Sequence, residues 1–194
     1  MPTPAPPAVL RPATPADSPS WLRCRVLSFL DSAYFDDVLR AKPATPHPGL
    51  DLVAVDAGGE VVGIMAASLD GGLATIDTVA VHPAHRRRGL AAALLTRVRA
   101  EARRLGAETL DAWTRDDPGT LAWYRAQGFT EGEHYLHVYA DHYHDAAEPG
   151  RAVRPGRERL APVKVFAHAP LSEEARLRAE FGRVHVCRRF RTSP

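Results

Sequence analysis

The feature that most constrains the fold of this chain is a change of hydrophobic period at His82-Pro83. Residues 74–81, just before it, alternate between two faces, as the residues of a half-buried strand do. After it, apolar residues recur every three to four positions, which is typical of an amphipathic helix. They are Leu90, Leu94, Val98, Ala102 and Leu105. A strand that turns directly into a helix indicates a fold in which helices pack on a sheet.

Further strands are expected on the N-terminal side of this segment. Residues 51–55 and 61–69 are apolar and β-branched, and Ala57-Gly58-Gly59 between them is a turn signal, so they indicate a hairpin. A second turn at 70–72 leads into the strand at 74–81. Earlier in the chain, Val9–Arg11 predicts a first strand, and the apolar spacing between Asp17 and Leu39 predicts one or two amphipathic helices.

Shorter elements are expected after the helix. Gly106 favours a helix stop, residues 109–114 read as a strand, and residues 118–127 read as a short helix capped by Asp116 or Asp117. Phe129 and residues 135–139 predict a strand, followed later by a strand at 163–167, a helix at 172–181 and a strand at 184–190. Helices that lie between runs of strands favour an α/β fold with a mixed, mostly antiparallel central sheet over a doubly wound fold.

The length of 194 residues fits one domain. Proline-rich residues 1–8 are expected to form a flexible tail, and residues 9–145 the core of the domain. Residues 146–162 lack periodicity and are expected to form an exposed loop, while 163–194 complete the same domain. No apolar run approaches the ~20 residues of a membrane helix, and the start lacks the pattern of a secretory signal. We therefore expect a cytoplasmic protein with no membrane partner.

Charge and metal-ligand patterns exclude several function classes. Cys24 and Cys187 have no paired spacing, so neither a zinc site nor a disulfide framework is expected. The histidines at 134 and 137 would face opposite sides of a strand, and those at 142 and 144 fall in a loop, so no metal site is expected. The formal net charge of +2 indicates no particular partner.

The turn after His82-Pro83 has the composition of an anion-binding site. The first N–H groups of a helix have no partners within it, and the helix dipole makes that end electropositive. Gly89 and Ala91 are small enough for a ligand to approach the main chain, and the arginines at 86–88 add positive charge. No Lys-Ser or Lys-Thr pair follows the glycine, as a phosphate-binding NTPase loop requires, and the three-glycine dinucleotide fingerprint is absent.

The remaining pattern, Arg-x-x-Gly-x-Ala at 86–91, resembles the acetyl-CoA signature of the GNAT family of N-acetyltransferases. Val79-Ala80-Val81 followed by His82-Pro83 is similar to the strand that this family places before its signature. A second family signature, Asn-x-x-Ala-x-x-aromatic-Tyr and then Gly-Phe, is matched by 117–124 and 128–129, with Asp117 in place of Asn and Thr120 in place of Ala. The resemblance covers Val9 to Tyr139.

The resemblance implies the GNAT acyl-CoA N-acyltransferase fold and direct transfer of an acetyl group from acetyl-CoA to a primary amine. It implies that Val79 N–H polarises the thioester carbonyl and that Tyr124 protonates the departing thiolate, although Tyr124 could also simply pack the short helix on the sheet. The cofactor-binding residues that it implies are Val79, Ala80, Val81, Arg86, Arg87, Arg88, Gly89, Leu90, Ala91, Asp117 and Tyr124.

The base that accepts the proton of the amine is a separate question. Asp77 is the first candidate because its carboxylate shares a strand face with Val79, and Glu133 and His134 are weaker candidates. Thr75 stands where the histone-modifying branch of the family carries its glutamate base, so we do not expect that branch.

Four questions stay open at the level of sequence. The chain could bind acyl-CoA without turnover, or the arginines at 151–159 and 183–191 could bind nucleic acid, although no reader motif accompanies them. The acceptor could be a small molecule or a peptide amine, because no motif covers the segments that would select it. A homodimer formed through the terminal strands is compatible with the sequence.

Overall fold

The computed structural model describes residues 8–153 and 160–194. Its strands are β1 (Val9–Pro12), β2 (Gly49–Val55), β3 (Val61–Asp70), β4 (Leu73–Val81), β5 (Thr109–Thr114), β6 (Thr130–Asp141), β7 (Lys164–Ala169) and β8 (Arg183–Thr192). Its α-helices are α1 (Ser18–Phe29), α2 (Leu90–Arg104), α3 (Pro118–Ala126), α4 (Glu148–Ala152) and α5 (Glu174–Glu180). Short 3₁₀ turns lie at Pro15–Asp17, Pro83–His85 and Leu171–Glu173.

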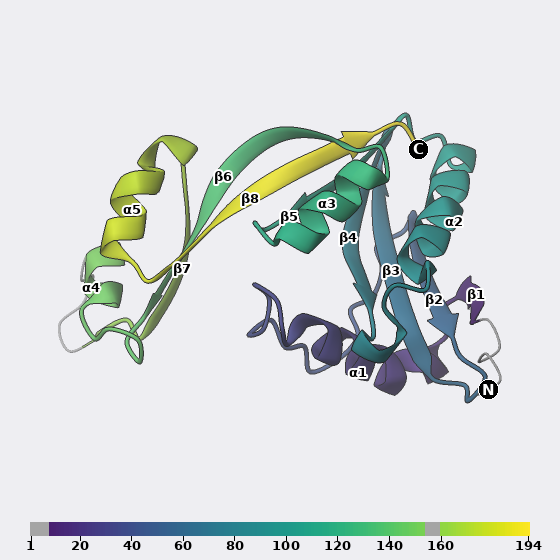
Figure 1. Cartoon of the computed structure of the whole chain (residues 1–194), viewed down its shortest axis with the longest axis horizontal. Coiled ribbons are helices and arrows are strands. Elements are labelled where there is room, and N and C mark those ends of the chain that lie inside the picture. Colours follow the sequence, from purple (N-terminus) through teal and green to yellow (C-terminus); the bar gives the residue numbers. More distant parts are fainter. Residues whose placement is uncertain (1–7, 154–159) are drawn as a thin grey trace.

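All eight of these strands form one sheet in the order β1-β2-β3-β4-β5-β8-β6-β7 (Figure 1). Neighbouring strands are antiparallel except for β4 and β5, which are parallel. The predicted mixed, mostly antiparallel sheet flanked by helices is therefore confirmed. The predicted hairpin at β2–β3 and the strand-to-helix segment of β4 and α2 are also present.

Helices cover the two faces of the sheet with separate hydrophobic clusters. On one face, α2 and α3 bury Leu94, Val98 and Tyr124 against β2 to β5. On the other face, α1 buries Trp21 and Cys24 against β2, β3 and the end of β4. The two faces matter for function because side chains from both reach the space between β4 and β5.

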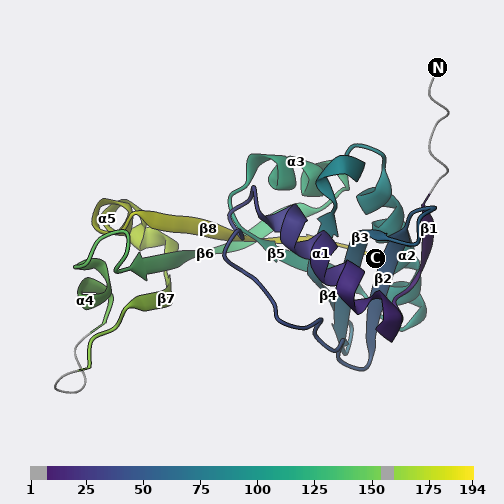
Figure 2. The ribbon, with the colours of Figure 1, turned by 90° about the horizontal axis from the view of Figure 1, so that it is seen from below.

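An arm extends from the main body. Figures 1 and 2 show β6 and β8 running out from beside β5 to carry β7, α4 and α5 at the far end. The arm has its own apolar cluster, in which Leu177 and Phe181 pack against Leu136, Val138 and Val184. Because β8 pairs with β5 on one side and with β6 on the other, the C-terminal strand lies within the main sheet.

Two segments differ from the expectations drawn from sequence. The apolar residues at 30–39 form turns and bends instead of a second helix, and Phe35 and Val38 are exposed. Part of the expected loop at 146–162 is helix α4, in which Glu148 and Pro149 are buried. Residues 1–7 and 154–159, which belong to the expected tail and loop, lie outside the described residues.

Glu148 explains why α4 is ordered against the arm, and it gives a first prediction. Its two carboxylate oxygens accept hydrogen bonds from the backbone N–H groups of Asp141, at 3.0 Å, and Gly182, at 2.6 Å. Glu148→Ala leaves both N–H groups without an acceptor, so we expect a loss of about 1–3 kcal/mol in unfolding free energy, measured by urea titration with circular dichroism. Asp145→Ala, an exposed change in the same segment, is the control, and an equal effect of both variants would contradict this role.

Candidate active site

The site begins where β4 and β5 separate. They pair from Leu73 and Thr109 as far as Ile76 and Ala112. On its other side β4 continues to pair with β3, where Asp77 is an extra residue between the pairs Ala67–Ile76 and Ala66–Thr78. Within the described residues, no strand covers the β5 side of β4 after Ile76. The main-chain groups on that side are therefore free to pair with an extended ligand.

A cleft of about 770 Å³ opens along this gap. One wall comes from α1 and the chain that follows it, and the opposite wall comes from α3. The floor is the second half of β4, and one end is closed by the turn at residues 85–92. The predicted strand, the predicted turn and the second signature thus lie around one cavity.

The turn that closes the cleft presents free backbone N–H groups. Arg87 and Gly89 both have positive φ angles, of 60° and 78°, which bend the chain sharply before α2 begins at Leu90. The first bond into the helix is donated by Ala93 N–H to the Gly89 carbonyl. In the described part of the chain, the backbone N–H groups from Arg87 to Ala92 have no acceptor. A row of unpaired donors at a helix N-terminus fits a doubly charged, extended anion.

The arginine side chains of this turn have a different role from its backbone. The guanidinium of Arg86 donates to the carbonyls of Ser28, at 2.8 Å, and Val81, at 3.3 Å, so it joins the turn to the end of α1 and to β4. Arg88 donates to the carbonyl of Ala84 at 3.0 Å. Arg87 is exposed and lines the cleft. The arginines therefore fix the shape of the turn and add positive charge to it.

Tyr124 lies at the centre of the α3 wall. Its ring stacks on Phe190 at a centroid distance of 5.1 Å and meets Phe129 edge-on at 5.2 Å, and only 2% of the residue is exposed. Burial raises the pKa of its hydroxyl. Tyr124 therefore both packs α3 on the sheet and lines the cleft. A phenol with a raised pKa stays protonated at neutral pH and can donate a hydrogen bond or a proton.

Asp77 also lines the cleft, on the second half of β4. Ser68 Oγ donates to its carboxylate at 3.1 Å. Asp77 is exposed as a residue, but neighbouring groups partly desolvate its carboxylate, and this desolvation and, to a lesser degree, the nearby charge of Asp111 raise its pKa. A carboxylate with a raised pKa is a stronger base than an ordinary aspartate, which suits proton removal.

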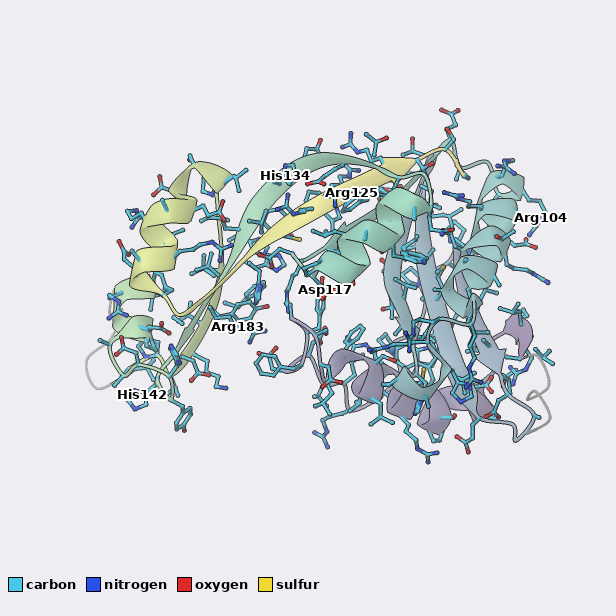
Figure 3. All side chains as sticks on the ribbon, in the orientation of Figure 1. Arg104, Asp117, Arg125, His134, His142 and Arg183 are labelled. Atoms are coloured by element: carbon cyan, nitrogen blue, oxygen red, sulfur yellow. The ribbon has the colours of Figure 1, made fainter. Side chains whose placement is uncertain are left out.

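The departures from the second family signature have a structural explanation. Asp117 is the N-cap of α3, and its Oδ1 accepts from both the backbone N–H and the Oγ1 of Thr120 at 2.7 Å. The pair Asp117 and Thr120, both in the cleft lining, therefore holds the start of α3, where Figure 3 labels Asp117. Asp117, and not Asp116, is the cap.

The weaker base candidates lie outside the cleft lining. Glu133 is paired with Arg189 and Arg191, and His134 with Glu131. The Oγ1 of Thr75 donates to the carboxylate of Asp111 at 2.7 Å. These side chains are engaged in surface or inter-strand contacts.

Several cleft residues carried no signal in the sequence. Tyr34 and Asp37 come from the chain after α1, and Trp113 and Thr114 from the end of β5. Arg25, in α1, is paired with Asp37 at 2.8 Å and also lines the cleft. The apolar spacing up to Leu39 predicted one or two helices across this segment but assigned no role to Tyr34 or Asp37, so only the path of the chain could place them.

Two further observations concern metals and membranes. Among residues 8–153 and 160–194, no three His, Cys, Asp or Glu side chains are grouped so as to hold a metal ion, and His134 and His142 lie on different parts of the arm (Figure 3). None of the helices in those ranges combines the length and apolar character that crossing a bilayer requires.

Comparisons with known proteins agree with this arrangement. A family model described as the acetyltransferase (GNAT) family matches residues 15–129, from the 3₁₀ turn before α1 to the end of the second signature. A search of curated proteins found no match.

Solved structures show the same fold at low sequence identity. The ribosomal-protein-S18-alanine N-acetyltransferase from Escherichia coli has a TM-score of 0.59 at 15% identity, over 96% of this chain and 93% of that one. An N-acetyltransferase from Staphylococcus aureus Mu50 has a TM-score of 0.58 at 12% identity, over 96% and 98%. PaiA N-acetyltransferase from Thermoplasma acidophilum, in complex with coenzyme A, has a TM-score of 0.54 at 11% identity, over 64% and 91%.

Proposed function

The chain belongs to the acetyltransferase (GNAT) family, and from that premise we propose that it transfers an acetyl group from acetyl-CoA to a primary amine by direct attack. The acceptor is a small-molecule or peptide amine. The observation that carries the proposal is the row of unpaired backbone N–H groups from Arg87 to Ala92 at one end of the cleft between β4 and β5.

The residues of the cleft fit acetyl-CoA. The N–H groups from Arg87 to Ala92 match a pyrophosphate. The positive N-terminal end of α2 and the nearby arginines attract its negative charge. The uncovered side of β4, from Asp77 to Val81, matches an extended pantetheine arm that needs main-chain partners. When bound, acetyl-CoA supplies a reactive thioester; the protein supplies position and proton transfers.

The side chains of the cleft supply the proton transfers that the reaction needs. The amine nitrogen forms a bond to the acyl carbon while the carbon–sulfur bond breaks, so the nitrogen loses a proton and the sulfur gains one. Asp77, with its raised pKa, accepts the proton of the amine, and Tyr124, which stays protonated, donates one to the sulfur. The N–H of Val79 stabilises the charge that develops on the acyl oxygen.

Among residues 8–153 and 160–194, the charge distribution supports this proposal over nucleic-acid binding; the arginines at 154, 157 and 159 lie outside these ranges. Arg188 pairs with Glu131, and Arg189 pairs with both Asp111 and Glu133. Arg183 pairs with Asp36, and Arg151 with Asp145. Arginines that are neutralised by neighbouring carboxylates contribute little attraction for phosphate backbones. A module that binds acyl-CoA without turnover is the second candidate, favoured only by the high pKa of Tyr124, which makes proton donation costly.

A thiol-release assay tests the proposal. Purified protein is incubated with acetyl-CoA and a panel of small amines and peptides, and free coenzyme A is measured over time. Amine-dependent release supports acetyl transfer. Binding of coenzyme A by calorimetry without release for any amine would favour the binding module, and neither binding nor release would contradict both.

Asp77→Asn gives a prediction with a defined pH dependence. A base must be deprotonated, so kcat/KM of the native protein rises with pH through the raised pKa of Asp77, above the ordinary value of 3.8. The variant lacks this limb, and we expect its kcat/KM at neutral pH to fall about 100-fold. Steady-state rates from about pH 4 to about pH 9, ~0.5 units apart, measure the profile from near the ordinary pKa upward.

Ionisation of Asp77 has the opposite effect on the stability of the folded protein: its contribution to stability falls as pH rises, whereas kcat/KM rises. The folded pKa of Asp77 is raised, so the folded state binds the proton more tightly than the unfolded state. Its contribution is favourable below the unfolded pKa and is lost as pH rises through the folded pKa. At neutral pH Asp77→Asn is therefore expected to unfold at a slightly higher temperature than the native protein. Reduced stability together with unchanged kcat/KM would show that Asp77 is structural.

A further inference from the structure

The chain that follows α1 crosses toward the arm. We call residues 31–37 the strap. In Figure 1 this segment leaves the end of α1 and runs toward the arm formed by β6 and β8. Figure 2 shows the same path from below. The strap contributes Asp31, Ser32, Tyr34 and Asp37 to the cleft lining. The contacts that hold the strap beside the cleft therefore determine which of its side chains an acceptor amine can meet.

Arg115, at the end of β5, makes the first attachment. The residue is buried, with 6% exposed. Its backbone N–H donates to the hydroxyl oxygen of Tyr34 at 3.0 Å, and its guanidinium lies 4.0 Å from the centre of the Tyr34 ring. The same guanidinium donates to the carbonyl of Ala33, the hydroxyl of Tyr139 and, at 3.3 Å, the Nδ1 of His137. One arginine thus connects the strap to β6.

Arg183, at the start of β8, makes the second attachment. It donates to both carboxylate oxygens of Asp36, at 2.6 and 2.8 Å, and to the carbonyl of Ala33 at 2.8 Å. Its guanidinium lies between two rings, 3.9 Å from the centre of Tyr139 and 4.5 Å from that of Phe35. Figure 3 places Arg183 on the arm near the strap. The carbonyl of Ala33 is held by both arginines.

The two attachments fix Tyr34 opposite Tyr124. Tyr124 comes from α3, on one face of the sheet, whereas Tyr34 comes from the chain after α1, on the other. Both line the cleft at the gap between β4 and β5. The Tyr34 side chain reaches this gap with its hydroxyl oxygen held by the backbone N–H of Arg115 at the end of β5. A molecule that enters the gap passes between them.

We propose that Tyr34 contacts the acceptor amine, and that Arg115 and Arg183 are positioning residues that hold the strap, and with it Tyr34, at that place. The proposal rests on the proposed function. The hydroxyl oxygen of Tyr34 accepts the Arg115 N–H and keeps a second lone pair, which accepts an N–H of the amine. This hydrogen bond turns the nitrogen lone pair toward the acyl carbon.

Kinetics of Tyr34→Phe test the contact. The phenyl ring can still lie under the Arg115 guanidinium, so the fold and coenzyme A affinity should be retained. Because the Arg115 N–H loses its acceptor, we expect the unfolding temperature of the variant to fall, and the kinetics are measured well below it. With the best amine of the panel, we expect KM for the amine to rise about tenfold, the value of one hydrogen bond, with KM for acetyl-CoA unchanged. Tyr143→Phe, an exposed tyrosine outside the cleft lining, is the matched control and should behave as the native protein. An unchanged amine KM in Tyr34→Phe would overturn the contact.

A double-mutant cycle tests the positioning role of Arg115. Arg115→Met should raise the amine KM as Tyr34→Phe does, and the double variant should be no worse than either single variant, because both remove the same contact. A purely structural arginine would instead lower kcat, coenzyme A affinity and the unfolding temperature together. Additive effects of the two changes would overturn the proposed coupling.

Hydrogen exchange gives a readout that does not need turnover. Arg115→Met and Arg183→Met should each increase exchange at residues 31–37 and leave α2 and β4 unchanged. If the native protein binds coenzyme A but acetylates no amine, the proposed function fails while exchange still decides the role of the arginines. If exchange in the strap is unchanged in both variants, the positioning role of Arg115 and Arg183 is overturned, even if the enzyme is active.

Discussion

Gly89→Glu is expected to lower the affinity of the protein for coenzyme A at least about 100-fold, or about 2.8 kcal/mol. Gly89 precedes α2 at a φ of 78° and is flanked by the unpaired N–H groups from Arg87 to Ala92. A carboxylate there would occupy the donors that the proposed function assigns to pyrophosphate, and it would repel a second anion. Isothermal titration calorimetry with coenzyme A measures the change.

Gly106→Glu provides a matched control for this variant. Gly106 lies at the other end of α2, also has a positive φ, of 90°, and like Gly89 has open space where a Cβ would be added. The two substitutions therefore carry similar backbone strain, of about 1 kcal/mol. Only Gly89 lines the cleft. Equal affinity losses in both variants would mean that Gly89→Glu acts through folding, and no loss in either would contradict the proposed anion site.

Tyr124→Phe is expected to lower kcat at least about 100-fold while coenzyme A affinity stays within about twofold of the native value. The substitution keeps the ring that stacks on Phe190 and meets Phe129, so the packing of α3 is retained. It removes only the hydroxyl that would protonate the sulfur. Single-turnover rates and calorimetry on the same sample separate the chemical step from binding.

The pH dependence of this variant adds a second criterion. Because burial raises the pKa of Tyr124, the native hydroxyl stays protonated through neutral pH, and loss of activity at alkaline pH should not come from its ionisation below pH ~10. An acetyl donor thioester with a more acidic thiol as leaving group needs less proton donation, so its rate should be lowered less by the variant. Full activity of Tyr124→Phe with acetyl-CoA would leave Tyr124 a packing residue.

Local sequence signals predicted the centre of the fold well. The period change at His82-Pro83 predicted β4 and α2, and the turn signals at 57–59 and 70–72 predicted the strands before them. These signals work because they depend on a few neighbouring residues: the alternation of a strand, the stripe of a helix, or a glycine at positive φ. The residues of both family signatures accordingly lie around one cleft.

Other features depended on contacts between distant residues. Arg115 and Arg183 reach Ala33 across separations of 82 and 150 residues, which no periodicity can reveal. The order β5-β8-β6 places the last strand beside the middle of the sheet and so brings these arginines to the strap. Glu148 similarly became a buried acceptor only because β6 and the turn before β8 lie beside α4.

The sequence by itself determined the strand, the turn and the helix that leave six successive N–H groups, 87–92, without acceptors, because backbone conformation there follows from neighbouring residues. Tertiary structure alone decided that the Arg86 guanidinium binds carbonyls of α1 and β4, and that Tyr34 and Tyr124 line the same cleft. Both outcomes depend on elements from the two faces of the sheet meeting at the gap between β4 and β5. Contacts of that kind join residues far apart in the chain, so no local sequence pattern reveals them.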